Sequence, residues 1–208
     1  TTPTKLYGLN EKEIVLMRYC KEAKKVVLVY KNGNIDLLHT DGTIENLPQF
    51  KNKFGGTSLN DLTISGTSAL LSTSEGIVHL NVKDAYITGH YNLNTPIKSA
   101  SLNKDLIYAA TDGGIYQCDV TQNPLDYSTW NLTSTLVATH IIALGDYLYF
   151  NTDKKGVYIL EPAATAPRQF ITAKQTSYFA DEMGILFLNA TTYTAVKAES
   201  PTQVPASQ

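Results

Sequence analysis

The residues best suited to metal binding or nucleophilic catalysis are few in this chain and widely spaced. Four histidines occur without H-E-x-x-H or Cys/His zinc spacing: His39, His79, His90 and His140. Cys20 and Cys118 have no C-x-x-C spacing, which predicts two small buried thiols. The chain contains no G-x-S-x-G elbow, P-loop or G-x-G-x-x-G motif. We therefore expect no metal, no cofactor and no catalytic residue, and predict that the protein is not an enzyme.

The turn Asp112-Gly113-Gly114 invites comparison with two known acidic turns. The calcium loop D-x-[DN]-x-[DN]-G needs further acidic ligands that this turn lacks. The sialidase Asp-box S-x-D-x-G-x-T-W also fails, because Tyr116 and Gln117 stand where Thr and Trp should be. Apolar and polar residues alternate on both sides of the turn through Leu106–Val120, and Asp and Gly tolerate the positive φ of tight turns. The stretch therefore predicts a β-hairpin.

The same order of apolar strand, polar turn and apolar strand recurs along the chain. Other copies span Val26–His39, Ser68–Val82 and Tyr147–Leu160, and a weaker fifth covers Met183–Lys197. Each strong copy contains a turn glycine, and these anchor glycines lie 43, 38 and 42 residues apart: Gly33, Gly76, Gly114 and Gly156. A period of about 40–45 residues with several strands per unit is typical of β-propeller blades.

Further short strands are expected on either side of each hairpin. Segments rich in small residues precede the hairpins, as suits an innermost strand near a crowded axis: Asn60–Ser65, Ile97–Leu102 and Thr139–Leu144. Polar segments follow the hairpins as fourth strands: Thr43–Leu47, Ile87–Leu93, Ser128–Thr133 and Gln169–Ala173. Each blade then exposes two apolar faces, which neighbouring blades must cover.

The sequence thus predicts an all-β domain over residues 1–208, a partial β-propeller of about four to five four-stranded blades. We expect blades near residues 8–58, 59–94, 95–135 and 136–174, and an incomplete fifth at 175–200 whose tail, 199–208, offers no fourth strand. The open blade edges predict self-association. Lys12–Lys25 contains good helix formers, but Ile14–Tyr19 falls where an innermost strand belongs and is assigned to a strand.

Binding residues are expected at one rim of the propeller, where the hairpin turns and the blade-to-blade links lie together. The candidates are the polar and charged residues of the turns: Lys31, Asn32, Glu75, Asp112, Asp153 and Lys154. The same residue types also favour turns, so a purely structural role is the alternative. Trp130, the only tryptophan, either packs on a blade or forms an aromatic platform for a sugar ring or a partner.

The composition argues against nucleic-acid binding and against a membrane-spanning helix. Charged residues make up 17% of the chain and the formal net charge is −2, which gives no electrostatic support for nucleic-acid binding. The chain has no apolar run of about 18 residues, so the sequence predicts no transmembrane helix.

Four phrases carry a family resemblance and occur in this order: Val27–Leu38, Ala69–Lys83, Leu106–Cys118 and Asn123–Trp130. Together they resemble the N-terminal propeller of the PorZ family of Bacteroidetes, whose members are often described as two-component regulator propeller proteins. The resemblance covers roughly residues 8–160, and Y-K-N-G-N-I-D (Tyr30–Asp36) is its most specific part. PorZ-like proteins have two propellers and a C-terminal β-sandwich, and assist the type IX secretion system in attaching cargo to surface lipopolysaccharide.

The resemblance implies a non-enzymatic binding scaffold in the cell envelope, in the periplasm or at the outer-membrane surface. Its partners would be envelope proteins or a glycan such as lipopolysaccharide. One alternative is the ligand-sensing periplasmic propeller of a hybrid two-component histidine kinase, since such sensors share the I-Y-x-A-T-x-x-G-[IL]-Y phrases. Another is a propeller lyase or glycosidase, in which Glu75, Asp112 and Asp153 would cluster with shifted pKa values.

Overall fold

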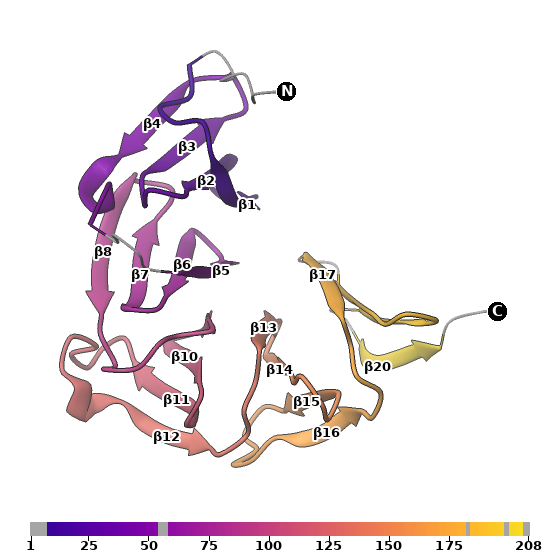
Figure 1. Ribbon diagram of the computed structural model, residues 1–208. Helices are drawn as coiled ribbons and strands as arrows, with labels where there is room; N and C mark the ends of the chain where they lie inside the picture. The colour runs from indigo at the N-terminus through magenta and orange to yellow at the C-terminus, as the bar shows by residue number, and fades with distance from the viewer. Residues whose placement is uncertain (1–7, 54–57, 182–183, 198–199, 206–208) are drawn as a thin grey trace.

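The computed structural model describes residues 8–53, 58–181, 184–197 and 200–205, and these form five antiparallel sheets. Each sheet contains four strands that pair in chain order. Figure 1 shows the sheets fanned around a common centre, with an open sector between the first and the fifth. The fold is therefore a β-propeller, as the repeat predicts, and each sheet is one blade.

The strands follow one another as four per blade. Their bounds are β1 (Ile14–Cys20), β2 (Lys25–Tyr30), β3 (Ile35–His39) and β4 (Ile44–Leu47) in blade 1; β5 (Leu59–Ser65), β6 (Ser68–Thr73), β7 (Gly76–Asn81) and β8 (Tyr86–Tyr91) in blade 2; β9 (Ser99–Asn103), β10 (Leu106–Thr111), β11 (Gly114–Asp119) and β12 (Asn131–Ser134) in blade 3; β13 (His140–Leu144), β14 (Tyr147–Asn151), β15 (Val157–Leu160) and β16 (Arg168–Ile171) in blade 4; and β17 (Ser177–Asp181), β18 (Gly184–Leu188), β19 (Tyr193–Lys197) and β20 (Ser200–Pro205) in blade 5. Two short 3₁₀ turns lie between strands, η1 (Pro48–Phe50) and η2 (Tyr127–Thr129).

The anchor glycines lie at the turn between the second and third strands of their blades, and close packing explains why three of them are glycine. Gly76, Gly114 and Gly156 have φ of +134°, +130° and +76°. A Cβ at these positions would lie 2.3, 2.3 and 2.0 Å from a backbone carbonyl oxygen of the chain at the end of the fourth strand. A side chain therefore cannot fit between the turn and the outermost strand.

A threonine closes each of these three turns in the same way. The hydroxyls of Thr73, Thr111 and Thr152 donate to the carbonyl oxygens of the anchor glycines at 3.0, 3.0 and 2.6 Å. Each hydroxyl also accepts a backbone N–H from within its turn, at 3.0 to 3.1 Å. The repeat seen in the sequence is thus a repeat of hydrogen bonds that fix the position of the turn.

Neighbouring blades are held together by layers of buried apolar side chains. Val29 and Leu37 of blade 1 pack with Leu71 and Leu80 of blade 2, and equivalent layers join each later pair of blades. Cys20 and Cys118 are free, buried thiols, as predicted, and burial raises the pKa of each. Burial of these layers is the main favourable term that holds the fan of sheets together.

Two predictions about the ends of the chain have different outcomes. Ile14–Cys20 is a strand despite its helix-forming residues, because the hydrogen bonds to β2 and the burial of Cys20 against blade 2 decide its conformation. The prediction that the tail carries no fourth strand was wrong, since β20 pairs with β19 and completes blade 5. Proline is tolerated in β20 because an outermost strand pairs along one edge only.

Candidate functional site

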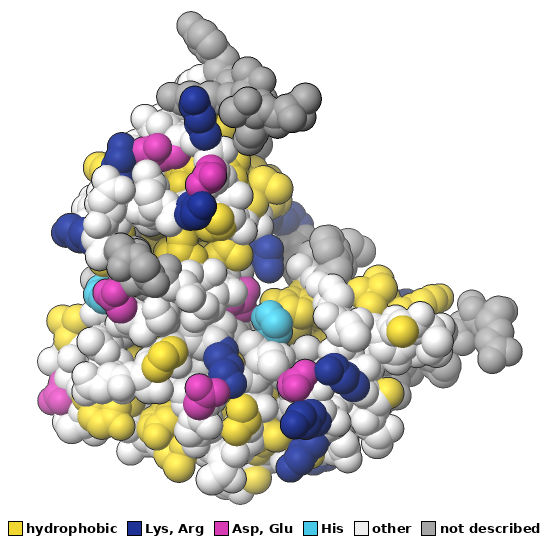
Figure 2. All heavy atoms as spheres, viewed as in Figure 1, with side chains coloured by type: hydrophobic (Ala, Val, Ile, Leu, Met, Phe, Trp, Pro, Cys, Tyr) yellow, Lys and Arg dark blue, Asp and Glu magenta, His cyan; other side chains and the backbone are white. Residues whose placement is uncertain are grey.

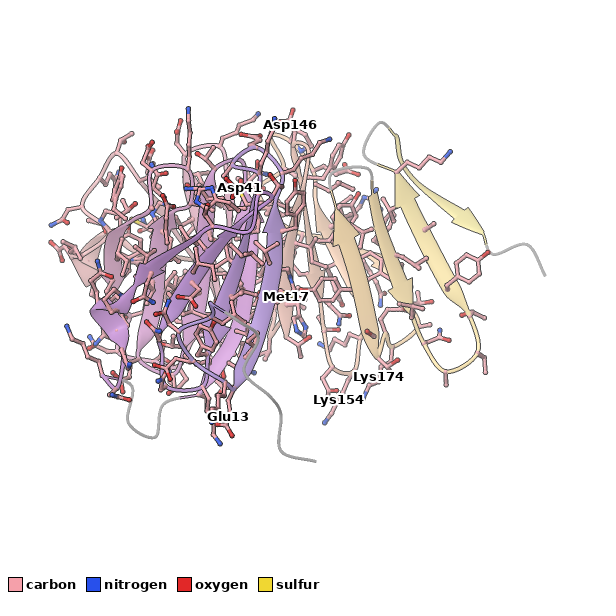
Figure 3. The ribbon with its side chains drawn as sticks, turned by 90° about the horizontal axis from the view of Figure 1, so that it is seen from above. Glu13, Met17, Asp41, Asp146, Lys154 and Lys174 are labelled. Carbon is pink, nitrogen blue, oxygen red and sulfur yellow. The ribbon has the colours of Figure 1, made fainter. Side chains whose placement is uncertain are left out.

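The predicted rim lies on one face of the propeller. Figure 3 shows Glu13, Lys154 and Lys174 at one edge of the molecule and Asp41 and Asp146 at the opposite edge. Lys154 lies in the turn between β14 and β15, whereas Glu13 and Lys174 lie in segments that lead into β1 and β17. The hairpin turns and the links between blades therefore share one face.

Ion pairs join the rim candidates to these linking segments. Lys31 Nζ lies 3.2 Å from a carboxylate oxygen of Glu13. Asp112 is 2.6 Å from Lys98 Nζ, just before β9, and Asp153 is 2.9 Å from Lys174 Nζ. All three pairs are at least partly exposed to solvent, so each contributes little to stability. Their effect is to hold each turn beside a neighbouring link.

The remaining rim candidates have different surroundings. The side-chain oxygen of Asn32 accepts the backbone N–H of Asn34 at 3.1 Å, within the first turn. Lys31 and Asn32 line a depression of about 250 Å³ together with Glu11, Lys12 and Glu13. Glu75 lies near His90, where its charge opposes the effect of burial, which lowers the His90 pKa. The structure therefore places these residues on one rim without gathering them into one pocket.

The carboxylates of the rim do not have the properties of a catalytic pair. Lys174 lowers the pKa of Asp153, whereas a general acid needs a raised value. Asp112 forms an ion pair with Lys98. Glu75, Asp112 and Asp153 lie in the turns of three different blades. On the face drawn in Figure 2, acidic and basic side chains stand beside one another. This arrangement gives no support to the lyase or glycosidase interpretation.

Trp130 packs inside the protein. Only 5% of its surface is exposed, and its indole N–H donates to the carbonyl oxygen of Pro124 at 3.0 Å. The ring belongs to the apolar layer between blades 2 and 3, together with Cys118 and Ile107. Trp130 therefore has the packing role that the sequence left open, and its ring face is not presented as a platform for a ligand.

A cluster of polar residues on the innermost strands was missed by the sequence analysis. Asp61 of β5 is buried and accepts a hydrogen bond from Ser99 Oγ of β9 at 2.6 Å. Arg18 Nη2 of β1 lies 3.9 Å from the other carboxylate oxygen. His140 of β13 packs edge-on against Tyr178 of β17, with ring centroids 5.0 Å apart. Each of the five blades thus contributes one residue to this axial cluster.

Burial sets the protonation states in the axial cluster. It lowers the pKa of His140, with Asp61 opposing this shift and Arg18 adding to it. It raises the pKa of Tyr178 to about 12, again with Asp61 and Arg18 acting in opposite directions. Near neutral pH the cluster therefore holds an uncharged imidazole and an uncharged phenol beside the ion pair of Arg18 and Asp61.

The axial cluster contains a serine, a histidine and an aspartate, but their hydrogen bonds do not have the arrangement of a catalytic triad. Ser99 Oγ donates directly to Asp61 and accepts the backbone N–H of Ile141 at 3.0 Å. A nucleophilic serine would instead donate to the histidine. His140 Nδ1 lies 3.2 Å from the hydroxyl of its neighbour Thr139. The cluster therefore ties the innermost strands together around the axis.

A positional signal for part of this cluster exists in the sequence. Asp61 and Ser99 lie 15 residues before the anchor glycine of their repeat, and His140 lies 16 before its own, where the turn is one residue longer. They pair with Ser72, Ala110 and Asn151, the residues before the turn threonines. Aligning the repeats on their glycines would have placed these three side chains at equivalent positions.

Among the residues that the structure describes, no group of three His, Cys, Asp or Glu residues is placed to hold a metal ion. Within the same residues, no helix is long and apolar enough to cross a membrane.

Five four-stranded antiparallel sheets around one axis define the protein as a β-propeller. The family described as "TSS9, PorZ, N-terminal beta-propeller domain" matches residues 1–131. The chain therefore belongs to the PorZ N-terminal β-propeller family, a family linked to type IX secretion. A comparison with curated proteins finds no match.

Solved structures of other propellers support the same fold. PorZ of Porphyromonas gingivalis, an essential bacterial surface component of the type IX secretion system, is 22% identical with a TM-score of 0.82. The match covers 96% of this chain and 28% of PorZ, so the chain spans less than a third of that protein's length. The propeller domain of Cps50 (Swd1) from Myceliophteria thermophila is 14% identical with a TM-score of 0.67, over 89% of this chain and 65% of that one. The computationally designed Ika8 protein is 10% identical with a TM-score of 0.60, over 93% and 61%.

Proposed function

We propose that this propeller is a non-catalytic binding domain of the cell envelope that assists type IX secretion and the attachment of cargo to the cell surface. The observation that carries this proposal is the family match over residues 1–131. The geometry is in keeping with it, because Ser99 donates to Asp61 rather than to a histidine, and the rim carboxylates Asp112 and Asp153 are paired with lysines. The sensor propeller of a histidine kinase is not the family that the match identifies.

The partners that we propose are envelope proteins or a glycan such as lipopolysaccharide, bound at the rim. Exposed turns on a rigid scaffold are common binding surfaces. Asp112, Asp153 and Lys154 lie in neighbouring turns of blades 3 and 4, and Lys98 pairs with Asp112 and also helps to lower the pKa of Asp153. This part of the rim therefore offers both signs of charge to a partner.

Cells that make the full-length protein with three rim substitutions test this proposal. The rim variant carries Asp112→Ala, Asp153→Ala and Lys154→Ala. The matched control changes two aspartates and one lysine of the turns on the opposite face, Asp41→Ala, Asp84→Ala and Lys83→Ala. We expect the rim variant to retain less cargo on the cell surface than the control, at equal amounts of protein. Equal surface cargo in both strains would refute a role for the rim.

We also propose that the isolated 208-residue chain self-associates through its open blade face, with a second copy as the occupant. Alternate side chains of β1 form an exposed apolar row, Val15, Met17 and Tyr19, and 57% of the Met17 surface is accessible. Such a row on an uncovered sheet favours pairing with another copy. Sedimentation should show a concentration-dependent dimer that Met17→Glu abolishes. A monomer at all concentrations would contradict the proposal.

A further inference from the structure

A cleft of about 510 Å³ lies between blades 3 and 4, on the face opposite the rim. Asp146, which lines it, is at the edge of the molecule opposite Glu13 and Lys154 in Figure 3. A volume of this size is in the range of sites that hold small ligands. No part of the proposed function uses this cleft.

Both blades contribute apolar side chains to the walls of the cleft. Blade 3 contributes Leu106 and Tyr108 of β10, and blade 4 contributes Leu148 of β14 and Leu160 of β15. The turn that follows β15 forms a further wall of small residues, 162–165. Its start is held by the ion pair between Glu161 and Arg168 and by a backbone hydrogen bond from Ala164 to Glu161. The cleft can therefore receive an apolar group on a fixed surface.

Polar side chains in the cleft lack protein partners. Tyr108 is only 6% exposed, yet its hydroxyl makes no hydrogen bond with any described residue while it lines the cleft. Gln117, opposite Tyr108 in the β10–β11 register, and Asn103 have side-chain amides that also bond to no described residue. Asn103 and Gln117 are half-buried, and none of the three polar groups is among the fully enclosed side-chain atoms without a partner, so all three can be reached from the cleft by a bound molecule.

The charges in the cleft are already matched. Lys104 Nζ lies 3.0 Å from Asp146, which joins the first turns of the two blades across the cleft, and Glu161 is bound by Arg168. The Tyr108 ring is buried, so the cleft has no exposed aromatic face for stacking a sugar ring. These features favour an uncharged ligand that combines an apolar group with amide hydrogen bonds.

We propose that the cleft binds an extended, uncharged peptide segment that carries one apolar anchor side chain. The anchor lies against Leu148 and Leu160. The amides of Gln117 and Asn103 bond to the peptide backbone, since a side-chain amide offers one donor group and one acceptor, as a peptide bond does. The Tyr108 hydroxyl, whose pKa is raised by burial, remains protonated and donates to a peptide carbonyl.

Titration of the 208-residue chain with blocked pentapeptides, Ac-Gly-Gly-Xaa-Gly-Gly-NH₂, tests this proposal by ¹H–¹⁵N NMR. With Xaa as leucine, we expect shifts of the amide signals of Tyr108, Gln117 and Leu148, and a lower Kd than with alanine or lysine. Tyr108→Phe should raise the Kd at least about threefold, as expected for one lost hydrogen bond. The matched control is Tyr149→Phe, because the Tyr149 hydroxyl is also without a partner but is buried away from the cleft.

Three results would overturn the proposal. The first is no shift of the cleft signals with any of the peptides. The second is the same Kd in Tyr108→Phe as in Tyr149→Phe. The third is that methyl β-glucopyranoside shifts the cleft signals where the leucine peptide does not, which would identify a sugar site instead. None of these results depends on secretion, so this test and that of the proposed function fail independently.

Discussion

Gly114→Ala tests the packing of the repeated turn, with Gly113→Ala as the matched control one residue away. At Gly114, φ is +130° and a new Cβ would lie 2.3 Å from the carbonyl oxygen of Ser134. At Gly113 the nearest atoms to a new Cβ are 3.7 Å away, at Thr111 and Tyr116, which is ordinary van der Waals contact. The two variants therefore add the same methyl group with very different consequences.

The expected cost at Gly114 has two parts. Holding alanine at this φ costs about 1–3 kcal/mol of backbone strain. Moving the end of β12 away from the methyl group weakens its pairing with Ile115, at about 1 kcal/mol per hydrogen bond. The sum is about 2–5 kcal/mol, a large fraction of the stability of a typical domain. Gly113→Ala should change the free energy of unfolding by less than about 1 kcal/mol, because the methyl group fits in the folded protein and alanine restricts the unfolded chain.

Equilibrium unfolding in urea, followed by far-ultraviolet circular dichroism, measures both variants. We expect Gly114→Ala to lower the urea midpoint strongly and Gly113→Ala to leave it nearly unchanged. The dependence of the free energy of unfolding on urea concentration should be the same in both variants and in the unsubstituted protein. A loss below about 0.5 kcal/mol at Gly114 would refute the reasoning. An equal loss at both positions would do the same, since the turn geometry alone distinguishes them.

Three further predictions concern buried polar groups. Tyr149→Phe removes a buried hydroxyl that has no partner, so the free energy of unfolding should rise by about 1 kcal/mol; a lower thermal midpoint would contradict this. Ser99→Ala takes the hydroxyl donor from the buried carboxylate of Asp61 and should lower stability by about 2 kcal/mol, whereas an unchanged urea midpoint would show that the axial cluster is not coupled. Burial lowers the pKa of His79, His90 and His140, so the unfolded chain binds protons first as the pH falls. The contribution of these histidines to the free energy of unfolding is therefore complete above the ordinary histidine pKa of about 6.5 and is lost as the pH falls below it. A urea midpoint that stays constant from about pH 7.5 to 5.5 would contradict this prediction.

The strands and their order could be predicted because the signal repeats. The glycine spacing, the turn residues and the alternation all indicate the same unit, so even Ile14–Tyr19, inside the helix-forming stretch Lys12–Lys25, was correctly assigned to a strand. β20 was missed because S-P-T-Q-V-P has neither alternation nor β-branched residues in series. Its pairing with β19 comes from its place beside an unpaired strand edge, which sequence pattern does not report.

The site could be predicted only in part, because its interactions join residues that are far apart in the chain. The turn positions of Asp112 and Asp153 follow from the repeat, but their pairing with Lys98 and Lys174 requires the links to fold back beside the turns. Likewise, the sequence places Trp130 in an insertion, but it does not show whether the ring packs between blades or faces solvent. The cleft between blades 3 and 4 arises from the spacing of two packed sheets, which no local pattern encodes.

The amount of cargo on the surface of cells links the fold to the function most directly. The full-length protein would carry either Gly114→Ala or Gly113→Ala, and the amount of each protein in the envelope would be measured alongside. If this propeller is a binding domain for type IX secretion, Gly114→Ala lowers surface cargo and Gly113→Ala does not. Normal surface cargo with a Gly114→Ala propeller that is unfolded in isolation would contradict that function.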